Sequence, residues 1–239
     1  MSMRFEGKVV LVAGGTGGLG RAVSLAFLEA GAKVHVTYRK QEELDGLKRA
    51  AKEGASRLDA HTVDVTDESS VRGLVESVVT HDSHLDILVN TVGAYAGGIK
   101  LWELENKLFE QMMALNLRSG YVLSRAVVPV MLKQSQGAVV NVAAKAAFDH
   151  GAGAAAYAAS KAAAVALFDS LAEDLKGSGV RVNSILPSII DTEANRKAMP
   201  KADFAKWPKP DDIARVILFL CSEDAKVIHG AAIPVFGNN

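Results

Sequence analysis

The sequence contains few of the features that mark secreted, membrane-embedded or nucleic-acid-binding proteins. Cys221 is the only cysteine, so no disulfide can form within the chain, which is typical of a reducing compartment. The 27 basic and 27 acidic residues cancel to a formal net charge of zero, so no strong field attracts nucleic acid or an anionic membrane. No apolar run is long enough to span a bilayer, and the polar start of the chain is unlike a signal peptide. We therefore expect a cytoplasmic protein that binds neither nucleic acid nor membrane.

Ligands for a metal ion are also scarce. Cys221 lies in the apolar helical pattern ARVILFLCSED, and no cluster of cysteine and histidine residues accompanies it. We therefore expect Cys221 to be a buried structural thiol, and we expect no metal site.

What the chain does contain is a regular alternation of strand and helix patterns. Its 239 residues are 49% hydrophobic, enough for one large α/β domain or two small ones, and no linker or repeat divides them. The predicted strands are mostly β-branched and nearly continuous in apolar character, as strands buried on both faces are. They cover residues 9–13, 34–38, 60–65, 87–89, 139–142, 181–186 and 232–236. We therefore predict a single α/β domain over residues 1–239, with a doubly wound, seven-stranded, mostly parallel sheet and helices on both faces.

Amphipathic patterns between these strands predict the helices. They cover residues 19–30, 71–79, 105–132, 155–176 and 211–221. The one long irregular stretch, residues 188–210, is longer than most connections in compact domains, and loops of that length are often functional. We interpret it as a substrate lid; the alternative is an ordered crossover on the surface.

A glycine-rich segment follows the first predicted strand and opens the first helix. Glycines permit a tight turn and a close approach of the backbone to a pyrophosphate, and the helix N-terminus supplies free amides and a positive dipole. This strand–turn–helix context is what a dinucleotide-binding motif requires, so the predicted fold is of the Rossmann type. The residues expected to bind the cofactor here are Gly14, Thr16, Gly17, Gly18, Leu19 and Gly20.

Tyr157 and Lys161 are four residues apart in an alanine-rich helical pattern, so the phenol and the ammonium are expected on one face of the helix. A free tyrosine has a pKa of about 10 and is a poor acid near neutral pH. A fixed cation lowers the pKa of a nearby phenol, and lowering it by about 3 units requires roughly 4 kcal/mol. The pair is therefore the candidate for proton transfer; the alternative is a chance helical pair.

Several motifs carry a resemblance to a known family. The Gly-x-x-x-Gly-x-Gly spacing that begins at Gly14, together with the Tyr157–Lys161 pair, resembles the short-chain dehydrogenase/reductase family over essentially the whole chain. The segment 90–93 is similar to the family's Asn-Asn-Ala-Gly, and the segment 187–192 to its Pro-Gly segment, although a serine replaces the glycine. The resemblance therefore adds to the cofactor site Asp64, Val65, Asn90, Gly93, Tyr157, Lys161, Pro187, Ile190 and Thr192.

This resemblance implies an NAD(P)H-dependent oxidoreductase with a small-molecule substrate. Tyr157 would donate the proton, and Lys161 would lower its pKa and hold the nicotinamide ribose. Asn116 falls where the family keeps an asparagine that positions a relay water. In related enzymes the helix around Tyr157 and the long helix before it form a subunit interface, which implies a homodimer or homotetramer.

The end of the second predicted strand bears on the choice of cofactor. An acidic residue there would bind the ribose 2′-hydroxyl and repel a 2′-phosphate. The chain has Tyr38, Arg39 and Lys40, two cations and no carboxylate, which favours NADP(H) while leaving NAD(H) possible. The alternative is that Arg39 and Lys40 only begin a solvated helix.

Ala144 stands where the wider family carries a serine that helps to hold the substrate oxygen, and Ala143 offers no hydroxyl in its place. The segments 144–149 and 191–207 resemble the dihydropteridine reductases, a branch of the family that also lacks this serine. That resemblance implies reduction of a quinonoid dihydropterin or a similar conjugated ring. An NADPH-dependent carbonyl or ketoacyl reductase of the same family is the alternative, and a non-catalytic NADP-binding sensor is a third interpretation.

Some side chains near the predicted substrate site keep two interpretations. Residues 195–197 either contact the substrate or form a solvated turn. Phe204 and Trp207 either pack the lid down or stack on a substrate ring. Lys145 and Asp149 either pair with each other or bind the substrate.

Overall fold

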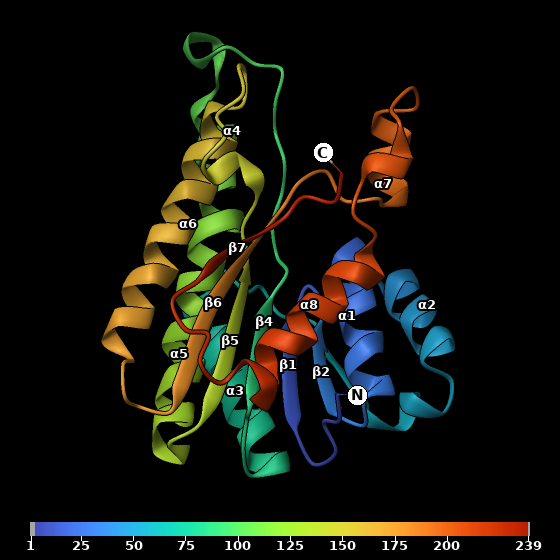
Figure 1. The fold of residues 1–239 in the computed structure, drawn as a ribbon, viewed down its shortest axis with the longest axis vertical. Coiled ribbons are helices and arrows are strands. Elements are labelled where there is room, and N and C mark those ends of the chain that lie inside the picture. The colour runs from blue at the N-terminus through green and yellow to red at the C-terminus, as the bar shows by residue number, and fades with distance from the viewer. Residues whose placement is uncertain (1–2, 239) are drawn as a thin grey trace.

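A single seven-stranded sheet, in which every neighbouring pair runs parallel, organises the molecule (Figure 1). The computed structural model describes residues 3–238, so residues 1, 2 and 239 of the predicted domain lie outside the described part. The strand order is β3-β2-β1-β4-β5-β6-β7, which reverses its direction of progress between β1 and β4. The strands are β1 Val9–Ala13, β2 Lys33–Thr37, β3 Leu58–His61, β4 Ile87–Asn90, β5 Gly137–Val142, β6 Val180–Pro187 and β7 Ala232–Val235.

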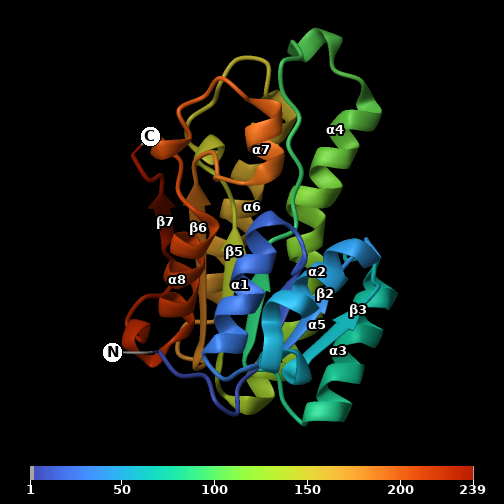
Figure 2. The same cartoon turned by 90° about the vertical axis from the view of Figure 1, so that its right-hand side faces the viewer.

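Helices cover both faces of this sheet (Figures 1 and 2). One face carries α1 Gly18–Glu29, α2 Gln41–Ala51 and α8 Pro210–Cys221. The other face carries α3 Glu68–Asp82, α5 Ser119–Gln134 and α6 Ala155–Asp174, with α4 Asn106–Met113 packed against α6. The short α7, Glu193–Ala198, lies beyond the carboxyl ends of the strands, on the side of the C-terminus (Figure 1).

Apolar side chains fill both interfaces because each central strand is buried on its two faces. In β1, Val10 and Val12 belong to the cluster beneath α1 and α8, whereas Val9 and Leu11 belong to the cluster beneath α3 and α5. Phe27 anchors the first cluster and Phe168 the second. Burying one such side chain contributes about 1.5–3 kcal/mol, so the sheet is held firmly from both sides. The loops at the carboxyl ends of the strands, where the candidate site lies, extend from this buried sheet.

The predicted fold class is confirmed: the chain forms a Rossmann-type doubly wound sheet of seven strands in one domain. Gly31, two residues beyond the end of α1, has a φ of +94°, a conformation that favours glycine. In the described residues no helix combines the length and the apolar character that crossing a membrane requires.

Three of the predicted elements differ from the structure. The strand predicted over 60–65 is β3, Leu58–His61, because Asp64 accepts a hydrogen bond from Thr66 N (2.9 Å) and turns the chain toward α3. The helix predicted over 105–132 is broken into α4 and α5 by a π-helical turn at Ala114–Arg118.

The third difference is the stretch 188–210, which is not irregular throughout. It contains α7 and a 3₁₀ turn at Phe204–Lys206. The helix is only six residues long and mostly exposed, so it lacks the apolar period by which longer helices are recognised.

Candidate active site

The turn between β1 and α1 forms a backbone cradle that only glycine fits. Gly14 has a φ of +74°, and a Cβ at Gly20 would overlap the Gly14 carbonyl oxygen. A Cβ at Gly15 would lie 2.5 Å from Val36 of β2. No side chain caps the N-terminus of α1 and no acidic residue lies in its first turn. These free amides and the positive helix dipole fit a pyrophosphate, so the residues present suit a dinucleotide.

Hydrogen bonds hold this turn at the point where the sheet changes direction. Gly14 N donates to Thr37 Oγ1 (2.8 Å) at the end of β2, and Thr91 Oγ1 donates to Ala13 O (2.7 Å) after β4. Asn90, buried at the end of β4, donates from Nδ2 to Asn141 Oδ1 (3.1 Å). In doubly wound sheets the ligand binds at this switch point, outside the carboxyl ends of the strands.

The segment after β2 presents the residues predicted to choose between cofactors. Tyr38 is half-buried, whereas Arg39 and Lys40 are exposed, and α2 begins directly after Lys40. The two cations precede a helix and face solvent, and their role in choosing the cofactor stays a prediction. Lys40 Nζ pairs with Glu43 Oε1 at 3.3 Å, and Thr16 Oγ1 donates to Glu43 Oε2 at 3.1 Å. The segment 38–40 itself carries no carboxylate, as the sequence shows, but α2 brings the Glu43 carboxylate to this end of the sheet.

Asp64 and Val65 lie just beyond β3, on the same end of the sheet. Hydrogen bonds from Thr66 lower the pKa of the Asp64 carboxyl, and Arg39 adds a smaller attraction in the same direction. Val65 is buried among apolar residues of the α3 face. Their assignment to the cofactor site remains a prediction.

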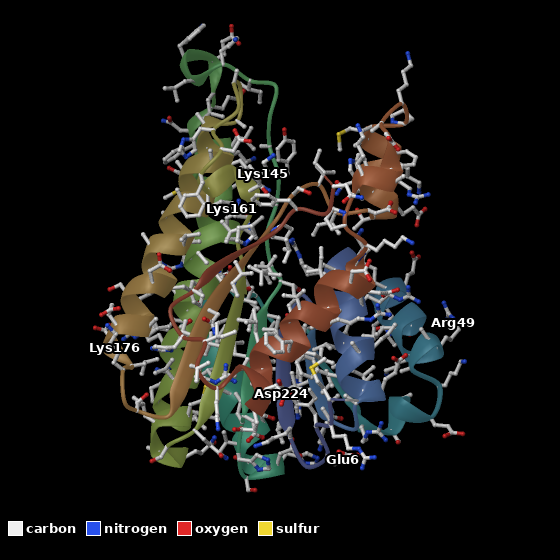
Figure 3. The ribbon with its side chains drawn as sticks, in the orientation of Figure 1. Glu6, Arg49, Lys145, Lys161, Lys176 and Asp224 are labelled. Carbon is white, nitrogen blue, oxygen red and sulfur yellow. The ribbon has the colours of Figure 1, made fainter. Side chains whose placement is uncertain are left out.

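The side chains of Tyr157 and Lys161 both project from α6 toward the ends of β4 and β5. Lys161 is 5% exposed, and its Nζ donates to Val142 O at 3.0 Å. A Cβ at Gly93 would lie 3.1 Å from this Nζ and 2.9 Å from Asn116 Oδ1. Gly93 therefore leaves room for a buried cation beside the amide of Asn116. Figure 3 labels Lys161 and Lys145 near the carboxyl end of the sheet, while Glu6 and Asp224 mark the opposite end.

Asn116 lies in the π-helical turn between α4 and α5 and is almost completely buried. Its Oδ1 accepts from Ala94 N (2.9 Å), and its Nδ2 donates to Ala94 O (3.0 Å) and to Ser160 Oγ (3.0 Å). These bonds fix the loop after Gly93 against α6. π-helical turns are frequent at functional sites, but the continuous helical pattern of the sequence did not reveal this one.

Burial governs the ionisation of the two central groups. It raises the pKa of Tyr157 to about 12, with a smaller contribution from Tyr95 in the same direction. It also lowers the pKa of Lys161 to about 8. Lys161 is not among the groups that shift the pKa of Tyr157 in the cofactor-free chain, so its expected lowering of that pKa beside a bound cofactor stays a prediction. With its raised pKa, Tyr157 is fully protonated at neutral pH.

Two residues that follow the carboxyl ends of strands bear on the substrate, Tyr95 after β4 and Ala144 after β5. Ala144, extended and buried, follows β5 and presents only a methyl group. The ring of Tyr95 meets that of Tyr157 edge to face, with 5.0 Å between centroids, and Tyr95 is 71% exposed. Tyr95 lies on the loop that Asn116 fixes, and sequence reasoning missed it because no periodic pattern includes that loop.

The segment 187–192 joins the predicted lid to the glycine-rich turn. A Cβ at Gly18 would lie 2.8 Å from Thr192 Cγ2, so Thr192 lies directly over the start of α1. The Thr192 hydroxyl accepts from Asn195 N (3.2 Å) and caps α7, while Asn195 Nδ2 donates to Ile190 O (2.8 Å). Pro187 ends β6 and is buried. These residues thus lie beside the cradle, as a cofactor-binding role would require.

Other side chains of the lid contact one another. Trp207 is buried and lies 5.0 Å from the ring of Phe204, which favours the packing interpretation of this pair. The Arg196 guanidinium lies 4.7 Å from the Phe204 ring and donates from Nη2 to Asp191 Oδ2 (2.8 Å).

Two further predictions concern the Lys145–Asp149 pair and Cys221. Lys145 and Asp149 pair at 3.5 Å, as one of their two interpretations proposed. Cys221 is buried as predicted, and burial raises the pKa of its thiol to about 12. Among residues 3–238, no group of three or more histidine, cysteine or acidic side chains is arranged to hold a metal ion.

Comparison with known proteins identifies the family. The short chain dehydrogenase family matches residues 8–203. The chain belongs to this family. It is 32% identical to the 3-oxoacyl-(acyl-carrier-protein) reductase FabG of Thermotoga maritima, over 98% of each chain. Among solved structures, ElxO with NADP bound superposes with a TM-score of 0.90 at 27% identity, over 96% of this chain and 97% of that one.

An NAD⁺-bound xylitol dehydrogenase also superposes with a TM-score of 0.90, at 26% identity, over 98% of this chain and 99% of that one. The chain is therefore an NAD(P)-dependent oxidoreductase of the short-chain dehydrogenase family. These relatives favour the carbonyl-reductase alternative over the pterin interpretation.

Proposed function

We propose that the chain is an NADPH-dependent carbonyl reductase. The observation that carries the proposal is the grouping of Tyr157, Lys161 and Asn116 beside Gly93, at the carboxyl ends of β4 and β5. It supplies a protonated phenol and a buried amine next to a backbone cradle for a dinucleotide. The activities named for the relatives, reduction of a 3-oxoacyl group and oxidation of a polyol, support a carbonyl or alcohol carbon as the reacting centre.

The bound nicotinamide would supply a hydride to the substrate carbon. Tyr157 would give its proton to the carbonyl oxygen as negative charge develops there, a contribution of about 10²–10⁴-fold in typical enzymes. Lys161 would hold the nicotinamide ribose and stabilise the phenolate that remains. Asn116 would keep the Gly93–Ala94 loop in place, and a relay water beside it is part of the same proposal.

NADPH is proposed as the preferred form of the cofactor. Arg39 is exposed beside the glycine-rich turn, and it makes no hydrogen bond or ion pair with any residue that the structure describes. Its guanidinium is therefore available to a 2′-phosphate, for which arginine has the matching bidentate geometry. Tyr38 adds no opposing charge.

A quinonoid dihydropterin, or a similar conjugated ring, is the second candidate substrate, and Ala144 favours it. A ketone concentrates developing negative charge on one oxygen and benefits from two hydroxyl donors. A quinonoid ring spreads that charge over several heteroatoms, so Tyr157 alone can suffice. The methyl group of Ala144 and the exposed ring of Tyr95 both suit a flat ring.

Three further assignments belong to the proposal. The segment 188–210 would act as the substrate lid, because Thr192 lies over Gly18 and Phe204 packs against the buried Trp207. The chain would assemble as a homodimer or homotetramer through α5 and α6, where Tyr121 and Leu132 of α5 are exposed. A cytoplasmic location would suit its one buried thiol.

Deuterium transfer tests the proposed reaction. NADPH labelled on the transferred position would be mixed with the enzyme and a panel of 3-oxoacyl thioesters, diketones and cyclic ketones. We expect alcohol products that carry one deuterium on the former carbonyl carbon, formed in step with NADPH oxidation. If every ketone stays unreduced while a quinonoid dihydropterin takes up hydride, the second candidate replaces the first. If NADPH binds but nothing is reduced, the chain is a cofactor-binding protein without turnover.

A further inference from the structure

Glu43 links the two segments that flank the expected place of the adenosine ribose. In dinucleotide-binding folds that ribose lies between the glycine-rich turn and the end of the second strand. Thr16 belongs to the turn, and Lys40 follows β2 by three residues. Glu43 accepts from Thr16 Oγ1 at 3.1 Å with one carboxylate oxygen and pairs with Lys40 Nζ at 3.3 Å with the other. A carboxylate thus stands where a 2′-substituent would be recognised.

The folding of α2 does not require this carboxylate. Leu44 and Leu47 bury the helix against the α1 face of the core, with exposures of 2% and 0%. The Lys40–Glu43 pair is largely solvent-exposed, and such pairs contribute about 0–1 kcal/mol. Glu42, the neighbouring glutamate, is exposed and makes no hydrogen bond or ion pair with the described residues. Glu43 alone of the two therefore reaches the turn.

We propose that Glu43 is a specificity-determining residue that weakens NADPH binding and lets the chain accept NADH as well. In the free protein its carboxylate forms an ion pair with Lys40 and accepts a hydrogen bond from the Thr16 hydroxyl. A 2′-phosphate would have to compete with this carboxylate for Lys40 and would be repelled by it. A 2′-hydroxyl could instead donate to the carboxylate, which helps NADH. This inference rests on the proposed use of NADP(H) and adds a residue that opposes it.

Separate substitutions of Glu42 and Glu43 by glutamine test the proposal, because each removes one negative charge from α2. Dissociation constants for NADPH and NADH would be measured by fluorescence titration. Glu43→Gln should tighten NADPH binding about three- to tenfold relative to the native chain, as expected for one charge near a dianion in water. It should leave NADH binding unchanged or weaken it up to about threefold. Glu42→Gln should change the NADPH constant less than about twofold, because the charge is further away and screened.

Equal shifts in the two glutamine variants would overturn the proposal, and so would equal tightening for both cofactors. Glu43→Asp is the second variant; it keeps the charge but shortens the side chain, and it should move the NADPH constant part of the way. Raising the salt concentration should shrink the Glu43→Gln effect. The native preference is a separate readout: tighter binding of NADH than NADPH would contradict the proposed cofactor, whereas the Glu43 test compares variants with each other.

Discussion

The cofactor end and the substrate end of the site are built in different ways. The cradle consists of backbone and glycine, contributed by one continuous segment from Gly14 to Gly20. The proposed substrate end consists of side chains from three distant segments, represented by Tyr95, Ala144 and Tyr157. A backbone cradle recognises a pyrophosphate common to all dinucleotides, so its residues can be recognised in a sequence. Side chains from separate loops define a substrate, so that specificity emerges only in three dimensions.

The largest expected effect is the loss of turnover in Tyr157→Phe, a substitution that tests proton transfer separately from cofactor binding. Tyr157→Phe removes the proposed proton donor but keeps the ring that packs against Tyr95. Turnover should fall about 10²–10⁴-fold, the usual contribution of a general acid. The NADPH dissociation constant, measured by fluorescence, should stay within about twofold because the cradle does not involve this phenol. A variant with native turnover would assign the proton to another donor.

The buried amine of Lys161 should make stability depend on pH. Its pKa is about 8 in the folded chain and 10.5 in the unfolded chain, so between these values the unfolded state binds more protons. Stability should therefore rise with pH through this window and be lost as pH falls toward 8, at about 1.4 kcal/mol per pH unit. Above pH 9 the raised pKa of Cys221, and above pH 10 that of Tyr157, act in the opposite direction, because the folded state then keeps these protons longer.

Urea unfolding of the native chain and of Lys161→Met between pH 8 and 10 measures this effect. The native free energy of unfolding should climb relative to that of the variant. Parallel curves for the two proteins would contradict a buried, titrating Lys161.

Gly18 tests the contact between the two regions. A Cβ there would meet Thr192 Cγ2 at 2.8 Å, so Gly18→Ala should displace Thr192 and weaken NADPH binding about tenfold. Thr192→Ser removes the clashing methyl and keeps the hydroxyl that caps α7. The double variant should regain most of the lost affinity. Failure of the second substitution to restore binding would mean that the cradle does not contact the lid through this pair.

Ala144→Ser should have a smaller effect, confined to the substrate end. An oxyanion donor is worth about 2.7–4 kcal/mol in acyl-transfer enzymes, but an added hydroxyl in an unadapted site gains less. We expect kcat/KM for a simple ketone to rise about fivefold, with no change in NADPH affinity. Ala144→Gly serves as the control, because it also changes the side chain at this position but adds no hydrogen-bond donor. If the ketone kcat/KM of Ala144→Ser is unchanged or lower than that of the native chain, Ala144 does not determine substrate specificity.

The sequence was sufficient where function depends on neighbours along the chain. Nearly continuous apolar runs predicted the strands of the sheet, and the four-residue spacing of Tyr157 and Lys161 predicted that they share a face of α6. Contacts between distant segments could not be predicted from the sequence. Glu43 reaches Thr16 across 27 positions, and only its three-residue spacing from Lys40 hinted at an ion pair. The raised pKa of Tyr157 could not be predicted either, because it depends on burial in the folded chain and, to a smaller extent, on Tyr95.

The ratio of kcat/KM values for a ketone and for a quinonoid dihydropterin, measured with saturating NADPH, tests the proposed substrate most directly. This ratio reports how differently the site stabilises the two transition states, independently of substrate concentration. A carbonyl reductase should favour a ketone of the panel by at least about tenfold. A higher kcat/KM for the dihydropterin than for every ketone would contradict the proposed function. Ala144 would then indicate an enzyme that reduces conjugated rings.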